Sequence, residues 1–349
     1  MKTYLLPENG KFYKANLHCH TTCSDGAMTP AQIKELYLSH GYSIVAYTDH
    51  DVLLGHNELT DDTFLALNGF EAEVIVPKES GLAIRKTCHL CFIALEPDRL
   101  TMPFYHREKY LFGNAPSYRH LLKFDERQPD FERVYHPDCV NEMIRRGKEN
   151  GFFVTYNHPT WSLEDFGDYT AYHGMDAMEI TNFSSVSAGY PEYNERVYDD
   201  MLRGGERIYC VSADDNHNRQ PETSGKWDSF GGFVMIKADR LDYKTITSAL
   251  REGHFYASQG PHIHDLYIED NRLTVTCSGA YKICLNTGKR RADAAYAKDG
   301  ELLEKASFRL TPDDIYVRVT VIDPRGYEAY SQAYFLTDLP AIDPIVRNK

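Results

Sequence analysis

The chain has 349 residues, of which 42% are hydrophobic, and a formal net charge of −13 at pH 7. This excess of acidic groups argues against a broad basic surface for duplex nucleic acid. The sequence holds no apolar run of 18 residues and no basic-then-apolar leader, so we expect no membrane contact and a cytoplasmic protein.

The length supports a full hydrophobic core and exceeds one average domain, which predicts one large domain with a small appendage. The eight cysteines lie mostly within strand-like runs, a pattern that favours reduced, buried thiols over a disulfide framework. Cys88 and Cys91 form a CxxC that has no second CxxC beside it. We therefore favour packed thiols there over a zinc ribbon.

Two histidines alternate in the stretch KANLHCHTTCSDG, which runs from residue 14 to 26. On an extended segment His18 and His20 point to the same side and can bind one metal ion, and Asp25 follows in a turn. Taken alone, this spacing fits two surface or packed histidines equally well.

A first βα unit follows. Residues 29–32 (TPAQ) form a capping box that starts a helix, and Gly41 ends it. The strand SIVAYTDH at 43–50 ends on His50, which we assign to metal. The aspartates on either side of His50 are interpreted as turn and capping residues.

The next two strand-like runs are GFEAEVIV, with Glu71 and Glu73, and TCHLCFIAL, with His89. The two glutamates share one face of a strand, so spacing alone does not select the metal ligand. Residues 96–136 are rich in aromatic and charged residues and have no clear period. They form either a wall of the substrate site or a solvated insertion.

A helix is predicted from Pro137 to Gly151, followed by the strand FFVTYNHP that ends on His158. Glu179 lies inside a further strand, MDAMEITNF. It could orient a metal ligand, but the interpretation we favour is polar filling of a barrel.

The run RIYCVSADDNHNRQ carries the last ligand candidates. Asp214 and Asp215 face opposite ways if the chain is extended, and the D-x-H spacing to His217 selects Asp215 as the ligand. For Asp214 we favour a role in orienting a ligand histidine. Arg219 and Lys226 follow and could hold a phosphate oxygen, although a solvated loop charge is the commoner fate.

Residues 227–264 predict a strand and a helix that close the large domain. His262 and His264 repeat the HxH spacing without acidic partners, so we expect His262 at the substrate rim rather than at a further metal. From residue 265 onward, short alternating strands predict a small antiparallel β sandwich. The expected domains are 1–260 and 261–349.

Six motifs occur in chain order: HxH with SDG at 18–26, TDHD at 48–51, GFE at 69–71, a strand histidine at 89, NHP at 157–159, and D-x-H at 215–217. In this order they resemble the polymerase-and-histidinol-phosphatase (PHP) metal-dependent phosphoesterases over about the first 260 residues, although D-x-H replaces the usual GSDAH. The segment HFYASQGPHIHDL resembles that of a branch that includes carbamate-ester hydrolases. The resemblance implies an α/β fold, a distorted (β/α)7 barrel, with a small C-terminal antiparallel β domain.

The same resemblance implies two or three divalent ions, which are zinc, manganese or iron. The ligand groupings that it implies are His18, His20, Glu71 and Asp215 for one ion, Glu71, His89 and His158 for a second, and Asp25, His50 and His217 for a third. Selecting Glu71 over Glu73 rests on this resemblance.

The implied activity is hydrolysis of a small phosphate ester by a metal-bridging hydroxide, with Asp215 and His217 as catalytic residues. The proton donor to the leaving group is either His217 or a metal-bound water. Two alternatives stay open: a carboxyl- or carbamate-ester hydrolase, and a metal-binding domain without turnover. The sequence contains neither G-x-S-x-G nor G-x-x-x-x-G-K, which argues against a serine hydrolase and a P-loop nucleotidase.

Overall fold

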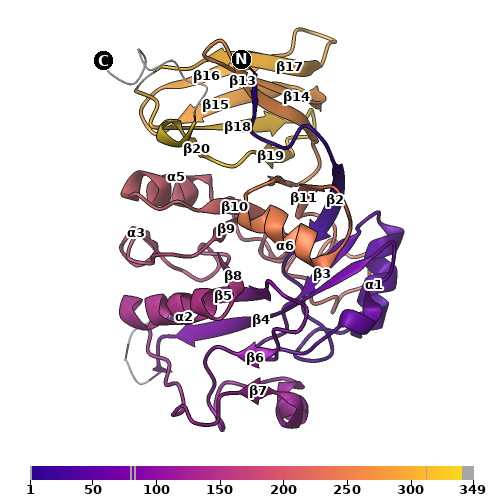
Figure 1. Cartoon of the computed structure of the whole chain (residues 1–349), viewed down its shortest axis with the longest axis vertical. Helices are drawn as coiled ribbons and strands as arrows, with labels where there is room; N and C mark the ends of the chain where they lie inside the picture. Colours follow the sequence, from indigo (N-terminus) through magenta and orange to yellow (C-terminus); the bar gives the residue numbers. More distant parts are fainter. Residues whose placement is uncertain (1, 79–80, 82–83, 312, 340–349) are drawn as a thin grey trace.

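The computed structural model describes residues 2–78, 81, 84–311 and 313–339, so the last ten residues of the predicted appendage lie outside the described part. One large mixed sheet runs through the molecule (Figure 1). Its strands pair in the order β10-β9-β8-β5-β4-β3-β2-β11-β12-β19-β18-β15-β16. No helix among the described residues is long and apolar enough to cross a membrane.

The part of this sheet that carries the predicted ligands mixes strand directions. Its strands are β2 (Lys11–Asn16), β3 (Ile44–Tyr47), β4 (Leu65–Ile75), β5 (Thr87–Ala94), β8 (Phe152–Tyr156), β9 (Ala177–Asn182), β10 (Tyr209–Ala213), β11 (Phe233–Ala238) and β12 (Phe255–Ser258). β2, β3 and β4 are parallel, and so are β8, β9 and β10. Between these two groups, β5 pairs antiparallel with both β4 and β8.

The α/β class is confirmed, but a regular (β/α)7 repeat is not. β4 pairs directly with β5 from Gly69–Ile93 to Ile75–Thr87, and an antiparallel neighbour needs no crossover helix. The Gln332 side chain joins β10, the first strand in the sheet order, to β12. Its Oε1 accepts from Cys210 N at 2.8 Å, and its Nε2 donates to the carbonyls of Cys210 and Phe255 at 3.1 and 3.2 Å.

Helices and short turns connect these strands. They are α1 (Pro30–Ser39), η1 (Asn57–Leu59), η3 (Ala115–Leu121), α2 (Pro137–Glu149), α3 (Phe166–Tyr169), α4 (Phe183–Ala188), α5 (Glu195–Gly204) and α6 (Tyr243–Arg251), with the short strands β6 (Thr101–Met102) and β7 (Lys123–Phe124) between η1 and α2. The predicted capping box is confirmed, because Thr29 and Gln32 exchange hydrogen bonds at the start of α1. On α2, a Cβ at Gly147 would lie 2.5 Å from the Phe92 ring, so only glycine allows this close packing.

The C-terminal part consists of antiparallel strands, as the alternating pattern predicts (Figure 1). The strands are β13 (Ile263–Glu269), β14 (Arg272–Ala280), β15 (Lys282–Thr287), β16 (Ala292–Tyr296), β17 (Leu303–Arg309), β18 (Tyr316–Ile322), β19 (Glu328–Tyr330) and β20 (Tyr334–Phe335), followed by the turn η4 (Leu336–Asp338). The sheet β1-β13-β14-β17, in which β1 is Thr3–Tyr4, shares a buried core with β15 and β18. Since β12 pairs with β19, the large sheet continues past residue 260, and the domain boundary stays a prediction.

Candidate metal centre

The fold brings nine predicted metal ligands together at one end of the parallel strands, where α/β barrels carry their active sites. Most lie two to four residues after the end of a strand, whereas Glu71 lies within β4 and His89 within β5. The nine are His18, His20, Asp25, His50, Glu71, His89, His158, Asp215 and His217.

The Glu71 carboxylate occupies the middle of this group and is 1% exposed. Its oxygens face ring nitrogens of five histidines: Oε1 lies 3.3 Å from His18 Nε2, 3.1 Å from His89 Nδ1 and 3.3 Å from His158 Nε2, and Oε2 lies 3.4 Å from His20 Nε2 and 3.2 Å from His50 Nδ1. One carboxylate can therefore bridge two neighbouring ions, as clustered metal sites require.

Asp215 approaches the same histidines from the loop after β10. Its Oδ1 lies 3.0 Å from His20 Nε2 and 3.2 Å from His18 Nε2. The backbone takes positive φ at Asp215 (53°) and at His158 (25°). Non-glycine residues rarely adopt this conformation, and such strain is typical of functional sites that hold a side chain in one position.

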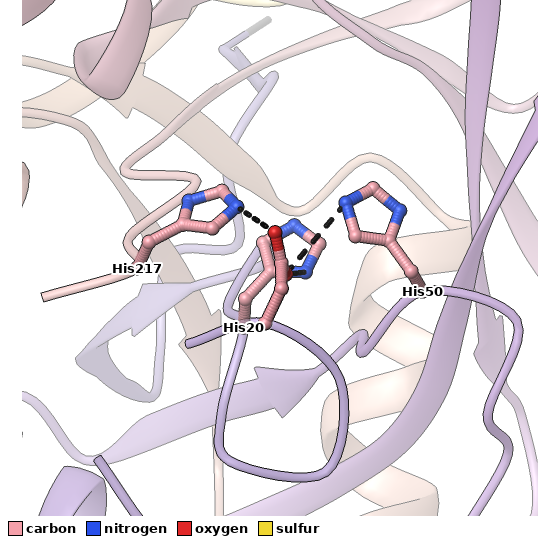
Figure 2. A group of neighbouring side chains, drawn as sticks. His20, His50 and His217 are labelled. Carbon is pink, nitrogen blue, oxygen red and sulfur yellow. Dashed lines mark ion pairs between the residues drawn. The ribbon is translucent and has the colours of Figure 1, made fainter. Parts of the chain in front are cut away.

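A third group surrounds Asp25. Its oxygens lie 3.4 Å from His217 Nε2, 3.7 Å from His20 Nδ1 and 3.9 Å from His50 Nε2. Figure 2 shows the rings of His20, His50 and His217 directed toward one another. His20 therefore contacts carboxylates on both sides of its ring, Asp25 on one and Asp215 on the other.

The hydrogen bonds of two ligands fix their tautomers. His18 Nδ1 donates to Glu179 Oε1 at 2.7 Å, and His217 Nδ1 donates to the Asp215 carbonyl at 3.0 Å. In the neutral rings Nε2 then carries a lone pair, and these lone pairs face carboxylates. Buried atoms without a hydrogen-bond partner in the described part include His20 Nδ1, His50 Nδ1, His89 Nε2 and Asp215 Oδ1. Acceptors that converge in this way fit bound cations.

The pKa values of two ligand histidines are raised by the carboxylates around them. Burial lowers the pKa of the His20 ring, but Asp215 and Glu71 outweigh it and raise the pKa to about 10. The pKa of His89 likewise rises to about 10, against burial, because of Glu71 and Glu73. The pKa of His50 instead falls to about 3, because of burial and the neighbouring His20. Metal ions compete with protons for the lone pairs of these rings.

Two buried carboxylates, Asp49 and Asp228, support the loops that carry ligands. Asp49 accepts from Thr21 N at 2.8 Å and from the Ser24 hydroxyl at 2.6 Å, which holds the turn before Asp25 and fits its interpretation as a turn residue. Asp228 accepts from the backbone N of His217 at 2.8 Å. Asp228 was missed because no local spacing connects it to the D-x-H motif.

Glu179 and Asp214 differ from the favoured interpretations. Glu179 is more than polar filling, since its Oε1 binds His18 Nδ1 and its Oε2 accepts from His158 N at 2.9 Å. Asp214 was expected to orient a histidine, and this prediction is wrong. Its carboxylate accepts from the backbone N atoms of Phe230, Gly231 and Gly232 at 2.9 Å each. Asp214 therefore stabilises the backbone of residues 230–232. Within the described part of the chain its carboxylate bonds to these N atoms and to the Tyr37 hydroxyl, at 2.8 Å, rather than to a ligand histidine.

Beside the nine residues is an open cavity of about 400 Å³. It is lined by Asp25, His50, Glu71, Glu73, His89, Phe112, His158, Trp161, Ser184, Ser185, Ala188, Asp215, His217, Arg219 and Asp228. The segment 96–136 contributes Phe112. It is tied to the centre because Asn114 N donates to Ser24 O at 2.7 Å and Arg133 forms a buried ion pair with Asp51. Phe112 thus lines the cavity, while much of the segment is exposed, and the segment's role as a wall of the substrate site stays a prediction.

The three predicted substrate residues are placed differently. Arg219 lines the cavity, and its Nε and Nη2 donate to the Asp25 carbonyl at 2.9 and 2.7 Å. Lys226 and His262 are not among the described residues that line it. His262 Nδ1 lies 3.2 Å from Tyr256 Oη, on the strand that leads toward the C-terminal sheets. A rim position for His262 is therefore not supported.

Comparison with known proteins gave few similarities in sequence. No family model matches the chain. A 5'-3' exoribonuclease of Haemophilus influenzae is 38% identical over 45 residues, which is 13% of this chain and 16% of that relative. The match therefore spans about one sixth of the relative's length.

Three solved structures match the chain at low identity. A two-domain protein from Bacteroides vulgatus, containing a predicted PHP-like metal-dependent phosphoesterase, is 15% identical with a TM-score of 0.42, covering 95% of this chain and 90% of that one. A protein from Bifidobacterium adolescentis, named a metal-dependent phosphoesterase, is 16% identical with a TM-score of 0.38, covering 63% and 91%. An amidohydrolase from Chromobacterium violaceum with bound sulfate is 17% identical with a TM-score of 0.35, covering 58% and 87%.

Proposed function

We propose that the chain is a metal-dependent hydrolase of the PHP type that cleaves a small phosphate ester. The observation that carries the proposal is the buried Glu71 carboxylate, which faces five imidazoles. Buried imidazoles and carboxylates at these distances need a proton or a metal ion between them, because buried polar groups left without a partner are costly.

The proposed ligand groupings are those that the family resemblance implies, and the side chains of each grouping lie close together. Asp215 and Glu71 lie with His18 and His20 around a first position. Glu71 Oε1 with His89 and His158 forms a second, so Glu71 is shared by both. A third position lies among the remaining predicted ligands, which are Asp25, His50 and His217. Imidazole and carboxylate ligands suit zinc, manganese or iron.

When bound, the ions supply a water of lowered pKa as nucleophile and neutralise charge on the ester oxygens. The protein fixes the direction of each ligand. Glu179 holds the ring of His18, and the Asp215 carbonyl holds the ring of His217. Asp215 and His217 both line the cavity, and we propose them as the catalytic residues. Arg219 lies at the same wall and is proposed to bind an anionic oxygen of the substrate.

One observation favours the alternative, a carboxyl or carbamate ester. Five carboxylates and one guanidinium line the cavity, which gives four net negative charges from Asp25, Glu71, Glu73, Asp215, Asp228 and Arg219. Two divalent ions balance these charges, and three exceed them by two. The net charge of the cavity with two or three bound metal ions therefore suits a neutral ester as well as a phosphate ester.

The test is a substrate panel on protein reconstituted separately with zinc, manganese and iron. We expect phosphomonoesters or phosphodiesters to be cleaved, and Glu71→Gln to lose at least about a thousandfold in kcat, since it removes the shared ligand. The matched control is Glu301→Gln, because Glu301 is exposed on the C-terminal part. Cleavage of carboxyl or carbamate esters alone would establish the alternative. Full metal occupancy without turnover of any ester would contradict both and leave a metal-binding domain.

A further inference from the structure

Two aromatic rings stand at the rim of an otherwise polar cavity. Phe112 is 39% exposed and Trp161 38% exposed, although both contact proposed ligands. The Phe112 ring lies 4.5 Å from the His50 ring, between centroids. The Trp161 ring lies 5.0 Å from the His158 ring and 5.5 Å from the His89 ring. Each aromatic ring therefore packs one part against the metal centre and leaves another open to the cavity.

The backbone holds Trp161 in place. Trp161 N donates to Glu192 Oε2 at 2.6 Å, and Thr160 N donates to Oε1 of the same carboxylate at 3.0 Å. Glu192 is fully buried. Since this loop is fixed before any ligand arrives, little entropy is lost when a ligand packs against the indole.

The loop of Phe112 is fixed in a comparable way. Gly113 takes a φ of +59°, and a Cβ there would lie 2.5 Å from the Ser24 carbonyl. The next residue, Asn114, donates from its backbone N to that carbonyl at 2.7 Å. The loop therefore lies directly on the turn that carries Asp25, and the position of Phe112 is coupled to the metal centre.

We propose that Phe112 and Trp161 are specificity-determining residues that select esters carrying a planar aromatic ring. The inference rests on the proposed function and adds the chemical class of the group attached to the ester. Rings stack on aromatic side chains through a face that saturated groups of the same size lack. A cavity of about 400 Å³ also lies within the range of pockets that enclose a small ligand, here an ester group with one ring.

The kinetic test compares benzyl phosphate with cyclohexylmethyl phosphate, which have similar size and the same type of primary-alcohol leaving group. For the metal-loaded protein we expect kcat/KM to be at least about tenfold higher for the benzyl ester, in line with one stacking interaction. Trp161→Ala should reduce this ratio toward one, Phe112→Ala should reduce it in part, and Trp161→Phe should retain most of it. Tyr296→Ala is the control, because Tyr296 is 57% exposed and lies on β16, far along the sheet order from the site.

A binding measurement separates ring selection from catalysis. Calorimetry with the non-hydrolysable benzylphosphonate and cyclohexylmethylphosphonate should show the same tenfold preference, lost in Trp161→Ala. The chain has two tryptophans, so Trp161→Phe leaves only Trp227. Quenching of wild-type fluorescence by 4-nitrobenzylphosphonate should disappear in this variant.

The outcomes are distinct. Cleavage of both phosphates with equal kcat/KM, and equal binding of both phosphonates, would overturn the ring selection and leave the proposed function standing. Cleavage of neither phosphate would overturn the phosphoesterase, and a tenfold preference for benzylphosphonate that Trp161→Ala removes would then still support the ring selection.

Discussion

Replacing Glu179 by glutamine tests whether the buried carboxylate on β9 organises the metal centre. The side chain is 1% exposed. Its Oε1 accepts from His18 Nδ1 at 2.7 Å, and its Oε2 accepts from His158 N at 2.9 Å and from Asn182 Nδ2 at 2.9 Å. Glutamine keeps the shape but carries an NH2 group in place of one oxygen. One of the two sides must then place a donor against a donor.

The size of the effect follows from these contacts. Loss of a partner that orients a metal-bound histidine typically costs 10- to 100-fold in metal affinity, equivalent to about 1.4 to 2.7 kcal/mol. The unpaired donor adds a destabilisation of about 1 to 3 kcal/mol to the folded protein. We therefore expect Glu179→Gln to fold, to bind metal 10- to 100-fold more weakly than the wild type, and to lose activity when metal is limiting.

The assay is competition for zinc or manganese with a chelating dye, with circular dichroism as the check on folding. Glu206→Gln is the matched control, since Glu206 accepts from His173 Nδ1 at 2.7 Å on the exposed surface. This second histidine–carboxylate pair lies outside the cavity-lining residues. A folded Glu179→Gln protein whose affinity stays within twofold of the wild type would refute the role assigned to Glu179.

Three further predictions concern stability. Gly147→Ala should destabilise the protein by about 1 to 3 kcal/mol in urea unfolding, because the added Cβ meets the Phe92 ring at 2.5 Å and this outweighs the helix propensity of alanine; equal or greater stability would contradict the packing. Burial raises the pKa of Glu164 from 4.5 to about 7 against three tyrosine hydroxyls. The folded state therefore binds the Glu164 proton more tightly than the unfolded state does. Between pH 4.5 and 7 the free energy of unfolding of the wild type should fall by roughly 3 kcal/mol relative to that of Glu164→Gln. The same difference in free energy between the two proteins at both pH values would exclude this. Asp199→Asn should cost about 3 kcal/mol, because Arg318 is 1% exposed and donates to both Asp199 oxygens at 3.0 Å; an unchanged midpoint would show that the pair is dispensable.

The metal centre was accessible from sequence because its ligands follow recognisable runs. His18, His50 and His158 each lie two or three residues after the end of a short strand, and the ends of parallel strands meet at one face. Choosing Glu71 over Glu73 needed the family resemblance. In the structure Glu71 contacts five histidines, whereas Glu73 lies 3.5 Å from His89 at the cavity wall. Local period alone does not distinguish the two.

What escaped prediction depends on contacts between distant parts of the chain. Asp214 binds backbone N atoms that lie 16 to 18 residues further on, and no spacing rule indicates such a pocket. Asp228 and Glu192 act in the same way on the loops of His217 and Trp161. Segment 96–136 contains only the short elements β6, η3 and β7 between irregular stretches, and these elements are too short to give a regular period.

The C-terminal strands, unlike the loops of the metal centre, could mostly be predicted from local sequence. Alternation predicts the strands β13, β14, β15 and β18, which contribute side chains to a shared core, and nearly all of β18 is buried. Strand β16 was missed because ADAAY carries small side chains and is largely exposed. The pairing of β12 with β19 is long-range and has no local signature.

The central claim is that nine side chains hold clustered divalent ions, and metal analysis tests it most directly. Protein purified without chelators and reconstituted with manganese or zinc should retain two or three ions per chain after extensive dialysis, as measured by mass spectrometry. Anomalous scattering from crystals of this material should place the peaks around Glu71. Retention of less than one ion per chain, or peaks remote from Glu71, would contradict the account.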